Sequence, residues 1–455
     1  MPLLVSNSKP RVILGTMTFG PDTSTGARIT SLDDYNTFLI PCAISALHWD
    51  RIEPSADSKA FHCSDHLQAA GYNEIDTARS YVGGKQEAFT KDAHWKERGL
   101  TLATKVYPDK PGKHSPEVLT KEFNTSLKEL GTDCVDIFYL HAADRSVPFA
   151  ETLEAVDKLH KETFGSPKKT RIILPSFTCG HADSALGQVR TARAIELHRL
   201  VITVHGKPFL TTSNASPNTT ISEDDKADGF DAQAFEVAEV VLTCKFNNWV
   251  RPTIYQGMYN AITRSLEHEL IPACKKYGLD VVIYNPIAGG LFSGKYKSKD
   301  IPTQGRYRQV ILQIISPTLP SLRGLKSKSA IDTAVHIGEL YRKRYFKDST
   351  FEALRVIELV VEKHGLTMVE TALRWVVNHS ALNVKDGTDG VIIGVSSLDQ
   401  LDQNLKDCEK GPLPEEVLQA LDKAWKISQP DTPNYWHLDL KYTYDTRKAL
   451  LVLAK

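Results

Sequence analysis

The sequence has no excess of charge of either sign. Its 455 residues include 55 lysines and arginines and 55 aspartates and glutamates, so the formal net charge is zero. A strong basic excess would attract nucleic acid or an anionic membrane surface, and this balance gives no reason to expect either partner. No apolar run approaches the roughly 20 residues that a membrane-spanning helix needs, and the first ten residues do not follow a secretory pattern. A cytoplasmic protein is the default expectation.

Cysteine is scarce and scattered. The seven cysteines, at positions 42, 63, 134, 179, 244, 274 and 408, are odd in number and include no Cys-x-x-Cys pair. This spacing favours reduced thiols over a disulfide framework. The stretch 62–66 contains two histidines, a cysteine and an aspartate, but these are crowded and no second cluster completes a tetrahedral zinc site. The sequence therefore predicts no metal centre.

Three short apolar runs each deliver a proton-active side chain. The run 71–76 ends at Asp76 and is followed by Tyr81, the run 102–105 ends at Lys105, and the run 135–141 ends at His141. Strand and helix patterns alternate through this part of the chain, which is typical of a parallel α/β sheet. Because the carboxyl ends of parallel strands lie on one face, we expect these four side chains to share a rim.

Further strand patterns extend this arrangement along the chain. Strands are expected to end near Thr16, Asp76, Lys105, His141, Gln256, Tyr284 and Gly394. Eight parallel strands would close a barrel, and the strand missing from this set falls between residues 163 and 229. We therefore predict an α/β fold of the (β/α)8 TIM-barrel type, in a single domain that spans residues 1–455.

Helix signals separate the strands. Ser31 precedes two acidic residues, as a capping residue does, and Ser115 with Pro116 opens a helix that ends at Gly131. Other helices are expected at 86–98, 149–162, 231–245, 265–277, 351–364 and 369–379, and one begins at Ser397. A short helical stretch is also expected at 65–70, as the continuation of the helix that follows Ser31.

Three irregular segments, near 40–64, 163–229 and 309–332, interrupt the alternation. They lack strong periodicity, and the second ends in a stretch rich in serine, asparagine and aspartate. We interpret them as translated non-coding sequence or the result of an unusual gene structure, with authentic functional insertions as the alternative. Within the second segment, the runs 171–174 and 200–204 have strand-like composition.

Longer motifs resemble a known family. They are the run from Asp76 to Tyr81, the sequence Tyr-Gln-Gly-Met-Tyr-Asn-Ala-Ile-Thr-Arg at 255–264, Asn-Pro-Ile-Ala-Gly-Gly-Leu at 285–291, and Gly-Val-Ser-Ser at 394–397. Together they resemble the aldo-keto reductases, most closely the aflatoxin-aldehyde reductase branch. The resemblance covers nearly all of the chain outside the three interruptions, and removing each interruption restores family-like sequence across the join.

The resemblance implies an oxidoreductase that reduces an aldehyde or ketone to an alcohol with NADPH. Tyr81 would protonate the carbonyl oxygen, Lys105 and Asp76 would tune its acidity, and His141 would orient and polarise the carbonyl. A phenol with a pKa of about 10 is a poor acid at neutral pH, and a neighbouring lysine cation lowers that pKa. We therefore expect the pKa of Tyr81 to lie below its ordinary value.

The resemblance also implies a dinucleotide site on two loops. Backbone N–H groups of the first loop would cradle the pyrophosphate, and the second loop would hold the adenosine end. The residues concerned are Gln256, Tyr284, Asn285, Pro286, Ala288, Gly289, Gly290, Leu291, Ser293, Gly294, Lys295, Arg306, Gly394, Ser396, Ser397, Gln400 and Asn404. Positions 289–295 also match the G-x-x-x-x-G-K pattern, but Tyr296 stands where a P-loop needs serine or threonine, which argues against ATP.

The resemblance places Met17, Tyr435 and Trp436 on the substrate side. The two aromatic residues would either line an aldehyde pocket or pack on the barrel. The family also has a strand ending in a Ser-Asn pair, and positions 206–214 faintly mimic it with Ser213 and Asn214, although a proline at 208 weakens a central strand.

The expected partner is a small aldehyde or ketone, and the resemblance leaves room for a homodimer. Two alternatives to an enzyme stay open. One is a nucleotide-binding regulatory subunit without turnover, and the other is an inactive product of a faulty gene structure. Cofactor binding would distinguish the enzyme and the regulatory subunit from the inactive product. Turnover would then distinguish the enzyme from the regulatory subunit.

Overall fold

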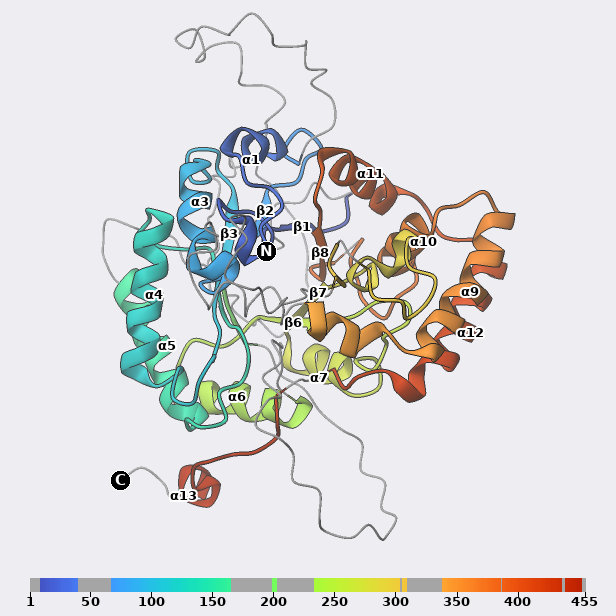
Figure 1. Cartoon of the computed structure of the whole chain (residues 1–455). Coiled ribbons are helices and arrows are strands. Elements are labelled where there is room, and N and C mark those ends of the chain that lie inside the picture. Colours follow the sequence, from blue (N-terminus) through green and yellow to red (C-terminus); the bar gives the residue numbers. More distant parts are fainter. Residues whose placement is uncertain are drawn as a thin grey trace, which may run out of the picture.

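Parallel strands occupy the centre of the molecule and helices lie around them (Figure 1). The computed structural model describes residues 9–39, 67–164, 199–202, 233–302, 305–308, 338–385, 387–435 and 438–451. The first and third predicted interruptions lie outside these residues. The second is described at its first two residues and at 199–202.

The strands follow one another around the sheet in the order in which they occur in the chain. They are β1 (Val12–Gly15), β2 (Glu74–Asp76), β3 (Thr101–Val106), β4 (Ile137–Leu140), β5 (Arg199–Ile202), β6 (Ile254–Met258), β7 (Asp280–Tyr284) and β8 (Gly390–Gly394). Every pairing is parallel, and β8 pairs back with β1, which closes the sheet into an α/β barrel arrangement. All carboxyl ends therefore lie at the same end of the sheet, where the predicted site residues are expected to meet.

The strand between β4 and β6 is short. β5 pairs with β4 over four residues and with β6 at Val201 and Ile254. It falls on the run 200–204 that the sequence marked as strand-like, so the position of the missing strand is taken by 199–202. The imitation of the family strand at 206–214, including Ser213 and Asn214, lies outside the described residues.

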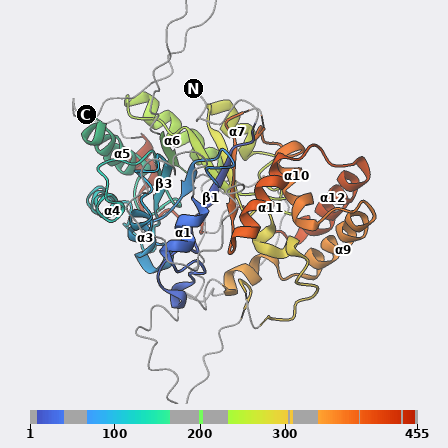
Figure 2. The same ribbon diagram turned by 90° about the horizontal axis from the view of Figure 1, so that it is seen from above.

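Outside β5, the strands consist almost entirely of buried residues. In β4, β6 and β7 nearly every position is buried, with Asp280 as the half-exposed exception. Parallel strands covered by helices on one face and packed together on the other need apolar side chains on both faces, which explains the continuous apolar runs in the sequence. The rotated view in Figure 2 shows the helices flanking this central sheet.

The helices connect successive strands and form the outer layer. The described α-helices are α1 (Leu32–Phe38), α3 (Gln86–Asp92), α4 (Pro116–Leu130), α5 (Phe149–Phe164), α6 (Ala234–Phe246), α7 (Leu270–Tyr277), α9 (Asp348–Lys363), α10 (Met368–Asn378), α11 (Leu398–Glu409), α12 (Glu415–Ser428) and α13 (Thr446–Leu451). In both views α9 and α12 lie side by side, outside α10 (Figures 1 and 2).

Several predicted helix ends are confirmed. The Ser31 side chain accepts the backbone N–H of Asp34 at 2.9 Å and caps α1. Pro116 stands in the first turn of α4, where its missing N–H is no loss, and Gly131 closes that helix in the left-handed conformation with φ of 65°. These ends follow local rules, so the sequence alone was enough to find them.

Three predicted helices are shorter than expected. Residues 67–70 form turns, α3 ends at Asp92 instead of continuing to 98, and α7 begins at Leu270 instead of 265. After α3, His94 takes a positive φ of 57°, which a continuing helix does not allow. Pro272 is tolerated in the first turn of α7 but would break a helix that had begun at 265.

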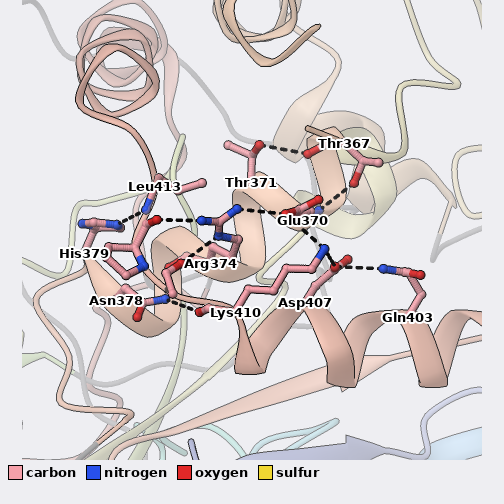
Figure 3. A network of polar contacts seen from close by, with 12 residues as sticks. Thr367, Glu370, Thr371, Arg374, Asn378, His379, Gln403, Asp407, Lys410 and Leu413 are labelled. Atoms are coloured by element: carbon pink, nitrogen blue, oxygen red, sulfur yellow. Dashed lines mark hydrogen bonds and ion pairs between the residues drawn. The ribbon is translucent and has the colours of Figure 1, made fainter. Parts of the chain in front are cut away.

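A polar network joins α10, α11 and the segment that follows α11 (Figure 3). Glu370 accepts a hydrogen bond from Arg374 at 2.9 Å and lies 3.1 Å from the ammonium of Lys410. The same ammonium lies 2.8 Å from Asp407, whose side chain is fully buried. The network fixes the two helices that follow and precede β8, and so supports the β8 end of the barrel.

Candidate active site

The four proton-active residues predicted from the sequence meet at the carboxyl ends of β2, β3 and β4. Asp76 ends β2, Lys105 stands one residue before the end of β3, and His141 follows β4 directly. Tyr81 begins η2 (Tyr81–Gly84), a 3₁₀ turn on the connection that leaves β2. Because β2 pairs with β3 and β3 pairs with β4, these strand ends are neighbours.

Lys105 is the centre of this cluster. Its ammonium lies 2.5 Å from Asp76 Oδ1, 2.7 Å from the carbonyl oxygen of Thr77 and 3.2 Å from the hydroxyl of Tyr81. The side chain is 0% exposed, and a buried ammonium needs such partners because it has lost its hydration. The three donors of the ammonium thus meet three oxygen atoms, one of which is the phenol.

The carboxylate of Asp76 is fixed on both of its oxygen atoms. Lys105 contacts Oδ1, and the side-chain amide of Gln256 on β6 donates to Oδ2 at 2.9 Å. The backbone of Asp76 is also held, since its carbonyl oxygen accepts from the backbone N–H and the hydroxyl of Thr16. The resemblance assigned Gln256 to the dinucleotide site, and the structure shows that it orients the carboxylate of Asp76.

The turn that carries Tyr81 has an unusual backbone. Val82, Gly83 and Gly84 all have positive φ, at 50°, 62° and 82°. A β-branched residue such as valine rarely enters the left-handed region, and a residue held there costs on the order of 1–3 kcal/mol. The Val82 side chain is buried against Gly20, where an added Cβ would come within 2.8 Å of it. Close packing therefore holds the turn in this conformation.

His141 forms the other wall beside the phenol. Its ring centroid lies 5.9 Å from that of Tyr81 and 5.4 Å from that of Tyr107, and both contacts are edge-on. Its backbone N–H donates to the carbonyl oxygen of Val106 at 2.9 Å, which ties the end of β4 to β3. The Tyr81 hydroxyl thus lies in a cluster formed by an ammonium, an imidazole and aromatic rings.

Burial sets the electrostatics of the cluster. Burial, followed by the charge of Asp76, raises the pKa of Tyr81 well above its ordinary value, so the expected lowering by Lys105 does not prevail. Burial also lowers the pKa of Lys105, and Asp76 opposes that effect. Burial and then the Lys105 charge lower the pKa of His141 well below its usual range. At neutral pH the site therefore presents a protonated phenol beside a neutral imidazole.

The loop after β7 has the backbone of a tight cradle. Asn285, Ala288, Gly289, Gly290 and Gly294 all have positive φ, and η3 (Ala288–Ser293) is kinked at the two adjacent glycines. An added Cβ on Gly289 would come within 2.6 Å of the Tyr341 ring, so only glycine fits there. At Gly290 a Cβ would meet nothing within 4 Å, so its surroundings are open and its φ of 102° is what requires glycine.

Arg306 contacts this loop indirectly, through Tyr341, a residue that the sequence did not single out. Its guanidinium donates to the Tyr341 hydroxyl at 2.8 Å and lies 4.8 Å from the centre of that ring. The Tyr341 hydroxyl donates in turn to the side-chain oxygen of Asn285 at 3.2 Å. Although burial works against it, Arg306 and then Arg344 lower the pKa of Tyr341. No local pattern marks Tyr341, because it follows the third interruption.

The remaining predicted residues of the first loop vary in exposure. Pro286 and Leu291 are buried, Tyr284 is buried at the end of β7, and Ser293 and Lys295 are exposed. Lys295 therefore extends toward solvent, unlike Arg306. The structure brings the loop to the carboxyl end of β7, next to β8.

The second predicted loop leads from β8 into α11. Gly394 is exposed, and an added Cβ there would meet nothing within 4 Å. The Ser397 side chain caps α11 by accepting the N–H of Gln400, and the Gln400 side chain accepts the N–H of Ser396 at 2.9 Å. Asn404 is buried one turn further along the helix. A helix N-terminus with free N–H groups is a favourable place for an anion.

The substrate-side predictions are described in part. Met17 is half-buried two residues after the end of β1, at the same end of the sheet as the other site residues. Tyr435 is 3% exposed and belongs to the hydrophobic core, so its ring packs on the barrel. Trp436 lies outside the described residues.

Neither a metal cluster nor a membrane-spanning helix is found in the described ranges. No group of three or more histidine, cysteine, aspartate or glutamate side chains there could hold a metal ion, and the stretch 62–66 lies outside them. No helix in the described part of the chain is both long enough and apolar enough to cross a bilayer.

Comparisons with known proteins give the class of this protein. The profile of the Aldo/keto reductase family matches residues 45–163 and 230–426, and skips 164–229, which is the second predicted interruption except for its first residue. An aldo-keto reductase of Pseudocercospora fijiensis is 34% identical over 376 residues, which is 82% of this chain and 99% of that protein.

Mammalian relatives give the same result. Aflatoxin B1 aldehyde reductase member 2 of Mus musculus is 33% identical over 374 residues, covering 80% of each chain. Aldo-keto reductase family 7 member A3 of Homo sapiens is 32% identical over 80% of this chain and 88% of that protein. The chain belongs to the aldo/keto reductase family, and this membership supports an oxidoreductase that acts on carbonyl groups. The resemblance inferred from the sequence is thereby confirmed.

Proposed function

We propose that this protein reduces aldehydes or ketones to alcohols with NADPH and that Tyr81 supplies the proton. The observation that carries the proposal is the buried ammonium of Lys105, which contacts both the carboxylate of Asp76 and the hydroxyl of Tyr81. Hydride addition to a carbonyl carbon leaves negative charge on the oxygen, and a nearby acid must neutralise it.

The residues of the site fit this step. With its raised pKa the Tyr81 hydroxyl is protonated at neutral pH but is a weak acid, so its donation depends on the negative charge that develops on the carbonyl oxygen. The phenolate left behind lies 3.2 Å from the Lys105 ammonium, which would stabilise it, and solvent then returns the proton. A neutral His141 can donate a ring N–H to the same carbonyl and hold it in place. Bound NADPH would supply the hydride.

The loops after β7 and β8 fit a dinucleotide. The open surroundings of Gly290 and Gly394 leave room for a ligand to approach the backbone. Arg306 offers a cation above the first loop, and the N-terminus of α11, which Ser397 caps, presents the positive end of the helix dipole beside the second. NADPH is proposed over NADH on the resemblance to the family, and Arg306 and Lys295 are the basic residues beside the pyrophosphate loop.

Three broader features complete the proposal. The fold is a (β/α)8 TIM barrel in which β5 supplies the strand missing from the sequence pattern, in one domain interrupted at the three irregular segments. The protein acts in the cytoplasm. Aldehydes are the first substrate class to test, because relatives named as aflatoxin B1 aldehyde reductases share about a third of the sequence.

The test is NADPH oxidation by the purified full chain with a panel of small aldehydes and ketones, followed by absorbance. Tyr81→Phe is the matched variant, because it removes one hydroxyl and leaves the ring. Turnover that is lost in this variant while NADPH still binds, as measured by fluorescence titration, supports the proposal. NADPH binding without wild-type turnover points to a regulatory subunit. Absence of both contradicts the enzyme and the binding site together.

A further inference from the structure

A second polar group lies behind the proposed proton donor. It consists of Arg79, Glu87 and Thr104, none of which contacts the Tyr81 hydroxyl in the hydrogen bonds described. The Arg79 guanidinium forms an ion pair with the carboxylate of Glu87, and the Thr104 hydroxyl donates to the same carboxylate at 2.6 Å. Arg79 precedes Tyr81 by two residues, Glu87 lies in α3, and Thr104 directly precedes Lys105 on β3.

These contacts form a closed set of interactions that links the turn with Tyr81 to the strand with Lys105. The backbone N–H of Arg79 donates to the carbonyl oxygen of Lys105 at 2.9 Å. Its side chain reaches Glu87, and Glu87 returns to β3 through Thr104. The turn with Tyr81 is therefore attached twice to the strand with Lys105, once through the backbone and once through buried side chains.

Arg79 also clamps the strained turn itself. A second guanidinium nitrogen donates to the carbonyl oxygen of Gly84 at 3.0 Å, so one side chain joins the residues before and after Tyr81. The three residues that follow Tyr81 are the ones with positive φ. A forked guanidinium is suited to this task because it holds two acceptors in a fixed geometry, which a lysine ammonium does not.

Burial makes the arrangement rigid. The side chain of Glu87 is 0% exposed and that of Arg79 is 20% exposed, so solvent cannot readily replace either partner. The Thr104 side chain is also buried. Exchange of any member for an apolar residue would leave a buried carboxylate or hydroxyl without its partner, and the turn would lose its second attachment to β3.

We propose that Arg79, Glu87 and Thr104 position Tyr81 for proton donation by fixing its hydroxyl against the ammonium of Lys105. This inference rests on the proposed function of Tyr81. It assigns no direct contact with substrate to the three residues, which act through the backbone of the turn. A displacement of about 1 Å in a reacting group can cost on the order of 100-fold in rate, so loss of the clamp should be visible in kcat.

The test compares Arg79→Met and Arg79→Lys with Lys85→Met. Lys85 is the matched control because it lies on the same turn and forms an ion pair with Asp22, but its side chain is 54% exposed. Arg79→Met is expected to lower kcat by about 10- to 100-fold with NADPH affinity within about twofold of the wild type. Arg79→Lys keeps the charge beside Glu87 and should recover part of that loss. Lys85→Met should leave kcat unchanged.

A second measurement does not depend on turnover. Carbon NMR of the tyrosine Cζ atoms, with the Tyr81 signal assigned from Tyr81→Phe, gives the pKa of Tyr81 in each protein. In Arg79→Met that pKa should move toward its ordinary value, because a loosened turn exposes the hydroxyl to water. In Lys85→Met it should stay where it is in the wild type.

The outcomes are separable. Folded Arg79→Met with wild-type kcat and an unchanged Tyr81 titration overturns the inference. If Arg79→Met does not fold, Arg79→Lys and Thr104→Val, which both keep the ion-pair charges, decide by the same two measurements. If the wild type shows no turnover, the proposed function fails, and the Tyr81 titration alone supports or overturns the positioning role.

Discussion

Two charged networks in this protein use the same side-chain types in different surroundings. One joins Asp76 to Lys105 at the strand ends, and the other joins Asp407 to Lys410 between α11 and the segment that follows it (Figure 3). The aspartates are almost equally buried, at 3% and 0% exposed. The lysines differ, since the side chain of Lys105 is 0% exposed and that of Lys410 is 40% exposed.

The pKa of each lysine follows from this difference. Burial lowers the pKa of Lys105 despite the neighbouring carboxylate. At Lys410 the cost of burial is smaller, and hydrogen bonds to Asp407 and Glu370 raise the pKa. An ion pair therefore has no fixed effect on acidity, because the loss of hydration competes with the attraction between the charges.

The third partner separates the two networks further. Beyond Asp76, the Lys105 ammonium contacts a phenol that can give up a proton. The helical network ends on backbone groups, because Arg374 donates to the carbonyl oxygens of Gly411 and Pro412. A network that ends on an acidic group can transfer a proton, whereas a network that ends on backbone carbonyl groups stabilises the fold.

The largest expected effect is the loss of the strand-end lysine. Lys105→Met should lower kcat by about 10²- to 10⁴-fold, because the phenolate that forms at Tyr81 loses its cation. Lys410→Met should leave kcat unchanged. Steady-state kinetics on both variants measures this. A comparable loss of kcat in the two variants would show that the networks do not differ in function. Because Lys105→Met leaves Asp76 buried without its cation, the double variant with Asp76→Asn serves as the folding control.

The next effect concerns stability. Arg374→Met removes hydrogen bonds to Glu370 and to two backbone carbonyls, so the free energy of unfolding should fall by about 1–3 kcal/mol. Turnover per folded molecule should stay at the wild-type level. Urea denaturation followed by circular dichroism measures the first quantity, and activity at low temperature measures the second. A drop in kcat with unchanged stability would contradict the structural role.

A smaller effect is expected from pH. Burial and then Arg374 lower the pKa of His379, whose Nε2 accepts the N–H of Leu413. Between that lowered pKa and the unfolded value of about 6.5, the unfolded chain binds a proton that the native chain does not. The stabilisation is therefore complete above about pH 6.5 and is lost as the pH falls.

Two histidines near the candidate active site, His114 and His141, affect the pH dependence of stability in the same direction. Their pKa values are also lowered, first of all by burial. His379→Gln should flatten the pH dependence of the free energy of unfolding below about pH 6.5 without abolishing it. Denaturation curves at a series of pH values test this. An unchanged slope in the variant would mean that His379 does not titrate as the structure indicates.

The smallest expected effect is a kcat that does not change with pH over a broad range. Because burial raises the pKa of Tyr81 above its ordinary value of about 10, kcat for reduction should stay nearly constant from neutral pH to about pH 9. Its alkaline decline should begin above pH 10. A decline centred between pH 7 and 9 would show that Tyr81, or Lys105 with its lowered pKa, loses its proton in that range.

Much of the site could be predicted from the sequence because its residues stand at the ends of apolar runs. Asp76, Lys105 and His141 each follow a stretch that can only be a buried strand, and parallel strands bring such ends together. The caps at Ser31 and Gly131 were predictable for a similar reason, since helix ends depend on neighbouring residues. The loop glycines after β7 were found through the resemblance to the family.

Other features had no local signal. Arg79 and Glu87 are eight residues apart, and their pairing depends on how the turn and α3 fold onto β3. Tyr341 reaches Asn285 across the third interruption. For β5 the local signal was incomplete, because the runs 171–174 and 200–204 both had strand-like composition, and the pairing of 199–202 with β4 and β6 decided its position.

By itself, the sequence determined the strand order, the family and the types of groups that meet at the strand ends. Periodicity and short motifs are enough for these, because they depend on residues close together in the chain. The tertiary structure alone decided the direction of the Tyr81 pKa, since burial is a property of the packed molecule and outweighs the nearby cation. It also decided which of two similar lysine–aspartate pairs contacts a phenol and which one belongs to a network that ends on backbone carbonyl groups. Both outcomes depend on contacts between segments far apart in sequence.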